Sequence, residues 1–105
     1  MANVNETQEA NRIGAQLRIA ATAGLITASN VAAADTVAGL LAAVAAATPV
    51  AGTPETVREQ TLRAIQAGDD LGLLTDALIA PLTTTAGLIA LTGIADSYKA
   101  RAFYD

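Results

Sequence analysis

Residues 53–68, TPETVREQTLRAIQAG, are the stretch of the chain that decides its fold class. Thr53 is a favourable N-cap residue, Pro54 suits the first position of a helix, and Glu55 interacts well with the positive end of the helix dipole. Gly68 suits a left-handed residue at the end of a helix. These signals predict a helix that begins at about Pro54 and ends just before Gly68.

Other helices are predicted on both sides of this one. Towards the N-terminus, apolar residues recur at helical spacing over about 6–27 and over 31–47, where either Ser29 or Asn30 is the expected cap. Towards the C-terminus, Asp69 or Asp70 is expected to cap a segment that ends or kinks at Pro81. A last helix is then expected over about 83–101.

No stretch alternates with the period of two that a half-buried strand requires. The sequence therefore predicts an all-α fold, a small Ala-rich bundle of about four to five helices without a sheet. We expect residues 1–105 to form a single domain, with a polar N-terminal tail over 1–5 and a linker between helices over 48–53.

The apolar content is high but consists largely of small side chains. Hydrophobic residues make up 52% of the chain, and 26 of its 105 residues are alanine. An alanine buries much less apolar surface than a leucine, so the core of a lone monomer is thin, and contact with another subunit would strengthen it. The residues predicted to form the core are Val37, Leu40, Leu41, Val44, Leu62, Ile65, Leu74, Leu78, Leu88 and Leu91.

One short sequence echo is visible. TAGLI occurs at 22–26 and again at 85–89, and Ala-Gly-Leu recurs at 38–40. A duplication would explain the echo, but chance recurrence is the favoured interpretation in a chain that is about a quarter alanine. Six of the glycines fall inside helical patterns, where we expect close approach of another backbone: Gly14, Gly24, Gly39, Gly72, Gly87 and Gly93.

Composition argues against several functional classes. The chain has no Cys and no His, so it lacks the residues for disulfides, Cys/His zinc sites, haem ligation and Ser–His or Cys–His catalysis. Its formal net charge is −4, which is unfavourable for binding phosphate backbones. We therefore expect no cofactor, no metal, no nucleic-acid partner and no small-molecule substrate.

The acidic residues offer two candidate sites, and both have a simpler interpretation. Asp69 and Asp70 with Asp76 are the densest cluster, yet they lack the spacing of a calcium loop, so a cap pair and a surface acid are the favoured interpretation. Nothing positions Glu55 and Glu59 with another carboxylate for acid–base chemistry.

Asp35 and Asp96 differ from the other acids because each stands alone in a strongly apolar segment. Such an acid either pairs with an arginine, such as Arg12 or Arg18, or lies at the rim of a helix. The rim position is favoured, since a buried charge is costly without a partner.

The aromatic residues are concentrated at the C-terminus. Tyr98, Phe103 and Tyr104 are the only aromatic side chains in the chain, and tyrosine and phenylalanine suit interface pockets. We predict them as the interface residues, either docking on a partner or folding back over the chain's own core.

A membrane protein is the main alternative. Residues 77–95 contain no charge over 19 positions, and 31–47 is also strongly apolar. Pro81, the three threonines at 83–85 and the abundance of Ala and Gly argue against insertion. A lysis pore or a pilus-type subunit would use these two segments.

The sequence favours a non-enzymatic structural subunit over an enzyme or a membrane protein. We expect a small helical protein that packs with itself or with other structural subunits into a larger homo-oligomeric or virion-like assembly. The N-terminus shows no secretory signal pattern, so the expected location is a virion or a cytoplasmic assembly, with the membrane as the alternative.

Overall fold

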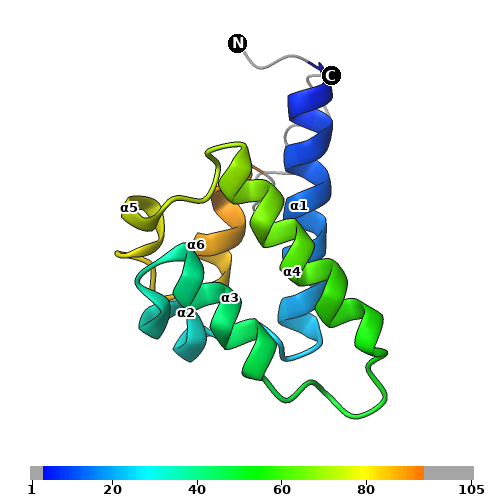
Figure 1. Ribbon diagram of the computed structural model, residues 1–105. Helices are drawn as coiled ribbons and strands as arrows, with labels where there is room; N and C mark the ends of the chain where they lie inside the picture. Colours follow the sequence, from blue (N-terminus) through cyan, green and yellow to red (C-terminus); the bar gives the residue numbers. More distant parts are fainter. Residues whose placement is uncertain (1–3, 94–105) are drawn as a thin grey trace.

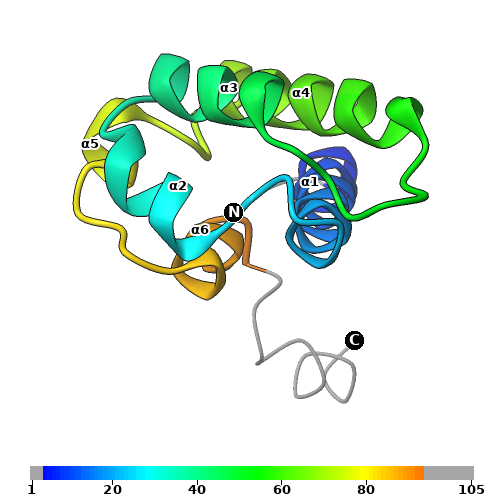
Figure 2. The same cartoon turned by 90° about the horizontal axis from the view of Figure 1, so that it is seen from below.

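The computed structural model of the protein describes residues 4–93, which form α-helices without any strand (Figure 1). This confirms the predicted all-α fold. In chain order the helices of this range are α1 (Val4–Thr22), α2 (Ala28–Ala34), α3 (Val37–Ala46), α4 (Glu55–Asp70), α5 (Asp76–Ile79) and α6 (Thr85–Ala90). Seen from below in Figure 2, α3 and α4 lie side by side, with α1 and α6 beneath them.

The two halves of the chain repeat the same local structure 48 positions apart. Gly24 follows α1 with φ 81°, and Gly72 follows α4 with φ 77°. After each glycine come two aliphatic residues and a threonine N-cap. The sequence repeats with the structure, since GLIT at 24–27 pairs with GLLT at 72–75, and TVAGLLA at 36–42 pairs with TTAGLIA at 84–90.

Threonine caps mark the starts of the short helices in both halves. Each threonine side chain accepts a hydrogen bond from the backbone N–H three residues later, which satisfies a donor that a helix start leaves free. The bonds run from Asn30 to Thr27 at 3.1 Å, from Gly39 to Thr36 at 2.9 Å, from Leu78 to Thr75 at 3.2 Å and from Gly87 to Thr84 at 3.0 Å. The prediction that Ser29 or Asn30 caps this helix is wrong, because Thr27 is the N-cap residue of α2.

Burial follows the same repeat. Seven positions that are buried in the first half are also buried 48 positions later, and the pairs are Ile13/Thr61, Leu17/Ile65, Ala20/Gly68, Ile26/Leu74, Val31/Ile79, Leu40/Leu88 and Val44/Thr92. The described residues therefore contain an internal structural repeat, in a different register from the TAGLI echo. Thr22 is the last residue of α1 whereas Thr85 is the first of α6, so those two copies are not structurally equivalent.

The halves interlock instead of packing as separate units. The long helices α1 and α4 contact each other, α4 also packs against α3 of the first half, and α1 packs against α6 of the second half. Each long helix thus packs against the last helix of the opposite half. Both halves contribute to one cluster of buried apolar side chains.

Most of the predicted core is buried. Val37, Leu40, Val44, Ile65, Leu74 and Leu88 are buried, and Leu41, Leu62 and Leu91 are half-buried at the edge of the cluster. The prediction is wrong for Leu78, which is 42% exposed because Ile79 is the residue of α5 that faces the core. The core also contains residues outside the predicted set, among them Ile13, Leu17, Leu25, Ile26 and Val31.

The predicted helix over 31–47 is interrupted. Asp35 adopts a left-handed conformation with φ 59°, which ends α2, and Thr36 caps α3 immediately afterwards. The backbone N–H of Val37, in the first turn of α3, donates to the Asp76 carboxylate at 2.9 Å. This hydrogen bond from the other half of the chain stabilises the break between α2 and α3. The sequence around residue 35 gives no sign of it, because Asp76 is distant in the chain.

The ends of α1 and α4 also differ from the predictions. Helix α1 begins at Val4, within the expected polar tail, and ends at Thr22, five residues before the expected end. Gly68 is not a C-cap but a buried position inside α4, where a methyl group would lie 2.7 Å from Leu74 Cδ1. The left-handed glycine is Gly72.

The N-cap residues of α4 and α5 also differ from the predicted ones. Pro54, not Thr53, occupies the N-cap position of α4, and Thr53 bonds to the linker instead. Asp69 and Asp70 are the last two residues of α4, and Thr75 caps α5.

The apolar stretch over 77–95 does not form one helix. Helix α5 ends before Pro81, and α6 starts only after the Thr84 cap. Helix α6 ends at Ala90, so the prediction of a helix that continues through residues 91–93 is wrong. The rest of that predicted helix, to about residue 101, lies outside the described residues. Of the helices in residues 4–93, none has the length and apolar character that crossing a membrane requires.

The repeat supplies a matched test of backbone packing. A methyl group at Gly39 would overlap the backbone carbonyl oxygen of Ala34, whereas at the counterpart Gly87 the nearest atoms belong to side chains, at 3.1 and 3.3 Å. We expect Gly39→Ala to lower the free energy of unfolding by about 2 kcal/mol or more, because the turn between α2 and α3 must move. Gly87→Ala should change it by less than about 1 kcal/mol, because the gain in helix propensity offsets the tighter packing. Urea unfolding of both variants measures the difference, and equal losses would contradict this account.

Candidate interaction site

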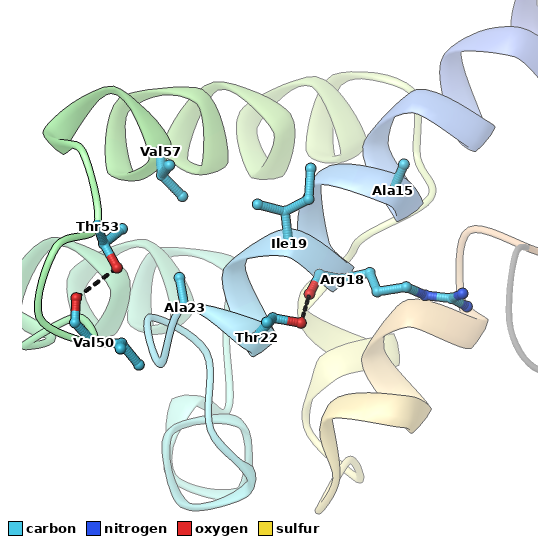
Figure 3. Close-up of a pocket in the computed structure, with 8 residues that line it drawn as sticks. All are labelled: Ala15, Arg18, Ile19, Thr22, Ala23, Val50, Thr53 and Val57. Carbon is cyan, nitrogen blue, oxygen red and sulfur yellow. Dashed lines mark hydrogen bonds between the residues drawn. The ribbon is translucent and has the colours of Figure 1, made fainter.

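An apolar groove lies between the C-terminal half of α1 and the start of α4. The linker over 47–54 runs across its end (Figure 3). The groove has a volume of about 630 Å³ and is lined by Ala15, Arg18, Ile19, Thr22, Ala23, Val50, Thr53 and Val57. Figure 3 shows these side chains coming from α1, the linker and α4.

Backbone and hydroxyl hydrogen bonds hold the linker on this face. The Val50 N–H donates to the Ala23 carbonyl at 2.7 Å, and the Thr53 hydroxyl donates to the Val50 carbonyl at 2.6 Å. The Thr22 hydroxyl donates to the Arg18 carbonyl at 3.1 Å. Because both threonine hydroxyls bond to nearby backbone, the groove presents mainly carbon to solvent.

The groove contains the two most exposed large apolar side chains in the described part of the protein. Ile19 is 50% exposed and Val50 is 58% exposed. Two other large apolar residues are exposed among residues 4–93, Leu71 and Leu78, and neither lines this groove. Adjacent exposed apolar side chains mark interaction surfaces more often than isolated ones do.

A second groove lies at the opposite end of the α1–α4 pair. It has a volume of about 410 Å³ and is lined by Glu9, Arg12, Ile13, Gln16, Gln60, Arg63, Ala64 and Ala67. The internal repeat relates the two grooves, since Ala15 corresponds to Arg63, Ile19 to Ala67, and Val57 to Glu9. At these three related positions, the apolar groove carries Ala, Ile and Val, whereas the second groove carries Arg, Ala and Glu.

The structure also shows what anchors α4 beside the groove. Arg58, whose side chain is 18% exposed, donates from Nη1 to the Ala45 carbonyl at 2.6 Å, and its Nε lies 2.7 Å from the Glu55 carboxylate. A cation on the last carbonyls of α3 suits the negative end of that helix. Glu55 and Arg58 thus form an ion pair one turn apart on α4, whereas Glu59 and Arg63 form no ion pair in the described structure.

The acidic cluster has structural contacts. Asp76 accepts a hydrogen bond from the start of α3, and Asp69 and Asp70 both lie within hydrogen-bond distance of Gln66 Nε2, at 3.4 and 3.3 Å. Across residues 4–93, no three side chains of the His, Cys, Asp and Glu types converge as metal ligands would. Asp35 lies exposed at the end of α2, a rim position as expected.

The predicted interface residues Tyr98, Phe103 and Tyr104 lie outside the described residues, as does Asp96. What the sequence analysis missed is the groove itself. The available signal was Ile19, which does not share the helical face of Ile13, Leu17 and Ala20 and therefore had no predicted partner.

The chain was compared with protein families, curated proteins and solved structures, and no match was found in any of the three comparisons.

The fold should tolerate a charged side chain in place of Ala15 and a smaller one in place of Ile19, because the repeat-related positions 63 and 67 carry Arg and Ala. We expect the double variant Ala15→Arg/Ile19→Ala, which introduces the residues found at 63 and 67, to keep the helical circular dichroism spectrum. Its free energy of unfolding should fall by less than about 1 kcal/mol, since both side chains are exposed. Leu40→Ala, at a fully buried site, is the comparison and should cost about 2–5 kcal/mol. A comparable loss in the double variant would show that the groove is part of the core.

Proposed function

We propose that the protein is a non-enzymatic assembly subunit that associates with further copies of itself through the apolar groove around Ile19 and Val50. The observation that supports this proposal is the difference between the two grooves. The repeated halves keep apolar or small residues at seven pairs of buried positions, whereas they differ at the exposed or half-buried positions of the grooves.

Comparing the two grooves distinguishes apolar residues that packing requires from apolar residues that packing does not require. If packing required apolar residues at the rim of α1 and α4, both halves would carry them. Instead Arg63 and Glu9 occupy the positions that Ala15 and Val57 occupy in the other half, and the position of Ile19 carries the much smaller Ala67. An exposed apolar surface that the fold does not require is a liability unless something covers it.

A second copy of the chain is the occupant that suits the groove. Arg18 is the one charged residue among those that line it, and in Figure 3 its side chain extends from α1 away from Val50 and Thr53. Ile19 and Val50 therefore form an uncharged surface that a second copy can cover. Burying Ile19 and Val50 in a shared interface would also add to a core that is rich in alanine.

Binding of an apolar small molecule is less well supported, although the volume falls in the range of ligand sites, about 300–1,000 Å³. Such sites enclose most of their ligand, whereas Ile19 and Val50 are each at least half exposed. An open surface of this kind suits a macromolecular partner better.

The proposal predicts that the full-length protein self-associates and that the groove variant does not. Ala15→Arg/Ile19→Ala should weaken association by at least about tenfold, because it removes apolar contact area and adds a charge at the centre of the interface. Leu78→Ala is the matched control, since Leu78 is similarly exposed on α5 but lies outside the groove. Sedimentation velocity over a range of concentrations compares the three proteins.

Two results would contradict the proposal. The first is a wild-type protein that stays monomeric up to about 1 mM, where the association free energy would be weaker than about 4 kcal/mol. The second is an oligomer whose stability changes equally in the groove variant and in Leu78→Ala.

The C-terminal residues stay a predicted second part of the interface. Deleting residues 103–105 removes Phe103 and Tyr104, and it should weaken association without lowering the unfolding temperature of dilute protein. Light scattering and thermal unfolding of the truncated chain measure the two effects. Unchanged association with a lower unfolding temperature would assign these residues to the core instead.

A further inference from the structure

The close contacts between helices mainly join the two halves of the chain. Within residues 4–93, α2 and α3 are the one pair of helices from the same half whose backbones lie close together over several residues. The other close pairs are α1 with α4, α3 with α4, α1 with α6 and α2 with α6, and each takes one helix from either half. A half on its own would therefore expose the buried side of its long helix, which carries Ile13 and Leu17 in α1 and Ile65 in α4.

The linker over 47–54 connects the two halves. In Figure 1 it leaves the end of α3, runs outside the helices and returns to the start of α4. Val50, Ala51 and Gly52 are exposed, and the Val50 N–H donates to the Ala23 carbonyl at 2.7 Å, so the linker is attached to the first half. Fully extended, its eight residues reach about 26–29 Å, roughly twice the diameter of a helix or more. The halves can therefore separate without the loss of any helix.

The contacts between the halves do not depend on which chain supplies each half. Helix α4 of a second copy would find the same partners on α1 and α3, including the Ala45 carbonyl that accepts a hydrogen bond from Arg58. The Asp76 carboxylate of a second copy would accept the Val37 N–H in the same way. Exchange of an identical element between protomers is a low-cost route to a dimer, because it repeats contacts that the fold already makes.

The linker turn is what distinguishes a closed chain from an exchanged pair. Gly52 adopts φ 90° in this turn, a backbone conformation that suits glycine and strains other residues. Apart from its chain neighbours, no atom of the described residues would lie within 4 Å of a methyl group at Gly52. A substitution there thus opposes the closed turn through the backbone angle alone and leaves the contacts between the halves intact.

We propose that two copies of the chain exchange their second halves and form an intertwined dimer, with the linker over 47–54 as the hinge. Helices α4, α5 and α6 of each copy then pack on α1, α2 and α3 of the other. A short flexible linker supplies its own half at an effective concentration in the millimolar range, so the dimer forms at comparable protein concentrations. The dimer uses the contacts of the fold itself, not the groove around Ile19, and so goes beyond the proposed function.

Cross-linking identifies which chain supplies each half, because the chain has no cysteine of its own. Arg12→Cys/Arg63→Cys places one thiol on α1 and one on α4, at exposed positions that line the second groove. The protein is refolded at about 1 mM, and the dimer is isolated by size exclusion, diluted and treated with a short bis-maleimide. We expect the dimer to give a covalent dimer on a denaturing gel and the monomer to give an intrachain product. Arg12→Cys alone is the control and should give no covalent dimer.

The hinge is tested by a matched pair of glycine variants. Gly52→Ala should raise the association constant of the dimer at least about tenfold, because two strained linker turns are released when the halves exchange. Gly72→Ala is the control, since Gly72 has φ 77° and equally open surroundings but lies outside the linker. Its turn is the same in the closed chain and in the dimer, so its dimer fraction should match that of the wild type. Circular dichroism checks that both variants are folded.

Three results would overturn the proposal. The first is an isolated dimer that gives only intrachain products, as a dimer joined through the groove would. The second is the absence of a dimer at about 1 mM in both the wild type and Gly52→Ala. The third is an equal rise of the dimer fraction in Gly52→Ala and Gly72→Ala.

The groove variant separates this inference from the proposed function. Adding Ala15→Arg/Ile19→Ala to the cysteine pair should leave the interchain cross-link intact, because neither residue belongs to the contacts that the halves exchange. The same two substitutions should weaken association through the groove. Loss of the interchain product in this variant would show that the groove, not the exchange of halves, joins the two copies.

Discussion

The contact between α1 and α4 is the constraint on which the rest of the structure depends. Both helices are long, both carry a buried stripe, and Ile13, Leu17, Thr61 and Ile65 on these stripes are fully or almost fully buried. Burying a large aliphatic side chain contributes about 1.5–3 kcal/mol, so neither helix can leave its partner without a large loss. Because each long helix also packs on the last helix of the opposite half, this one contact joins the two halves of the duplication. A polar bond between Gln16 and Thr61 at 3.2 Å crosses the same contact and satisfies the hydroxyl of a buried threonine.

The internal repeat shows at which positions the two halves of the chain carry different residues. At the α1–α4 contact, buried side chains of the two halves pack against each other, so a change in one helix has to be accommodated by the other. The exposed rims of the two long helices face no such requirement. They differ accordingly, with Ile19 on one rim and Ala67 on the other. Of the two repeat-related grooves in the described residues, the one around Ile19 is thus the apolar one, which is why it is the best candidate for an interaction with a partner.

Much of the local structure can be read from the sequence. Apolar spacing predicts the helices and most of the residues that are buried in α3, α4 and α6, because a helix that packs on one side must place its large side chains three or four positions apart. The duplication was visible as well, as GLIT against GLLT and as TVAGLLA against TTAGLIA, but only at a spacing of 48 residues. The shorter TAGLI echo pairs residues that are not structurally equivalent, since alanine-rich segments resemble one another by composition alone.

The sequence by itself determined that the chain is helical and where most of its helices lie. The cap at Thr84 acts through a bond to Gly87, three residues further along, so its effect is local. Only the tertiary structure decided that Gly68 is a packing position, because Leu74 occupies the space its side chain would need. In the same way it decided the break at Asp35, which a carboxylate 39 residues away from Val37 stabilises, and the groove at Ile19, which exists only where α1, the linker and α4 meet. These features depend on atoms that are distant in the chain, and helical periodicity carries no information about them.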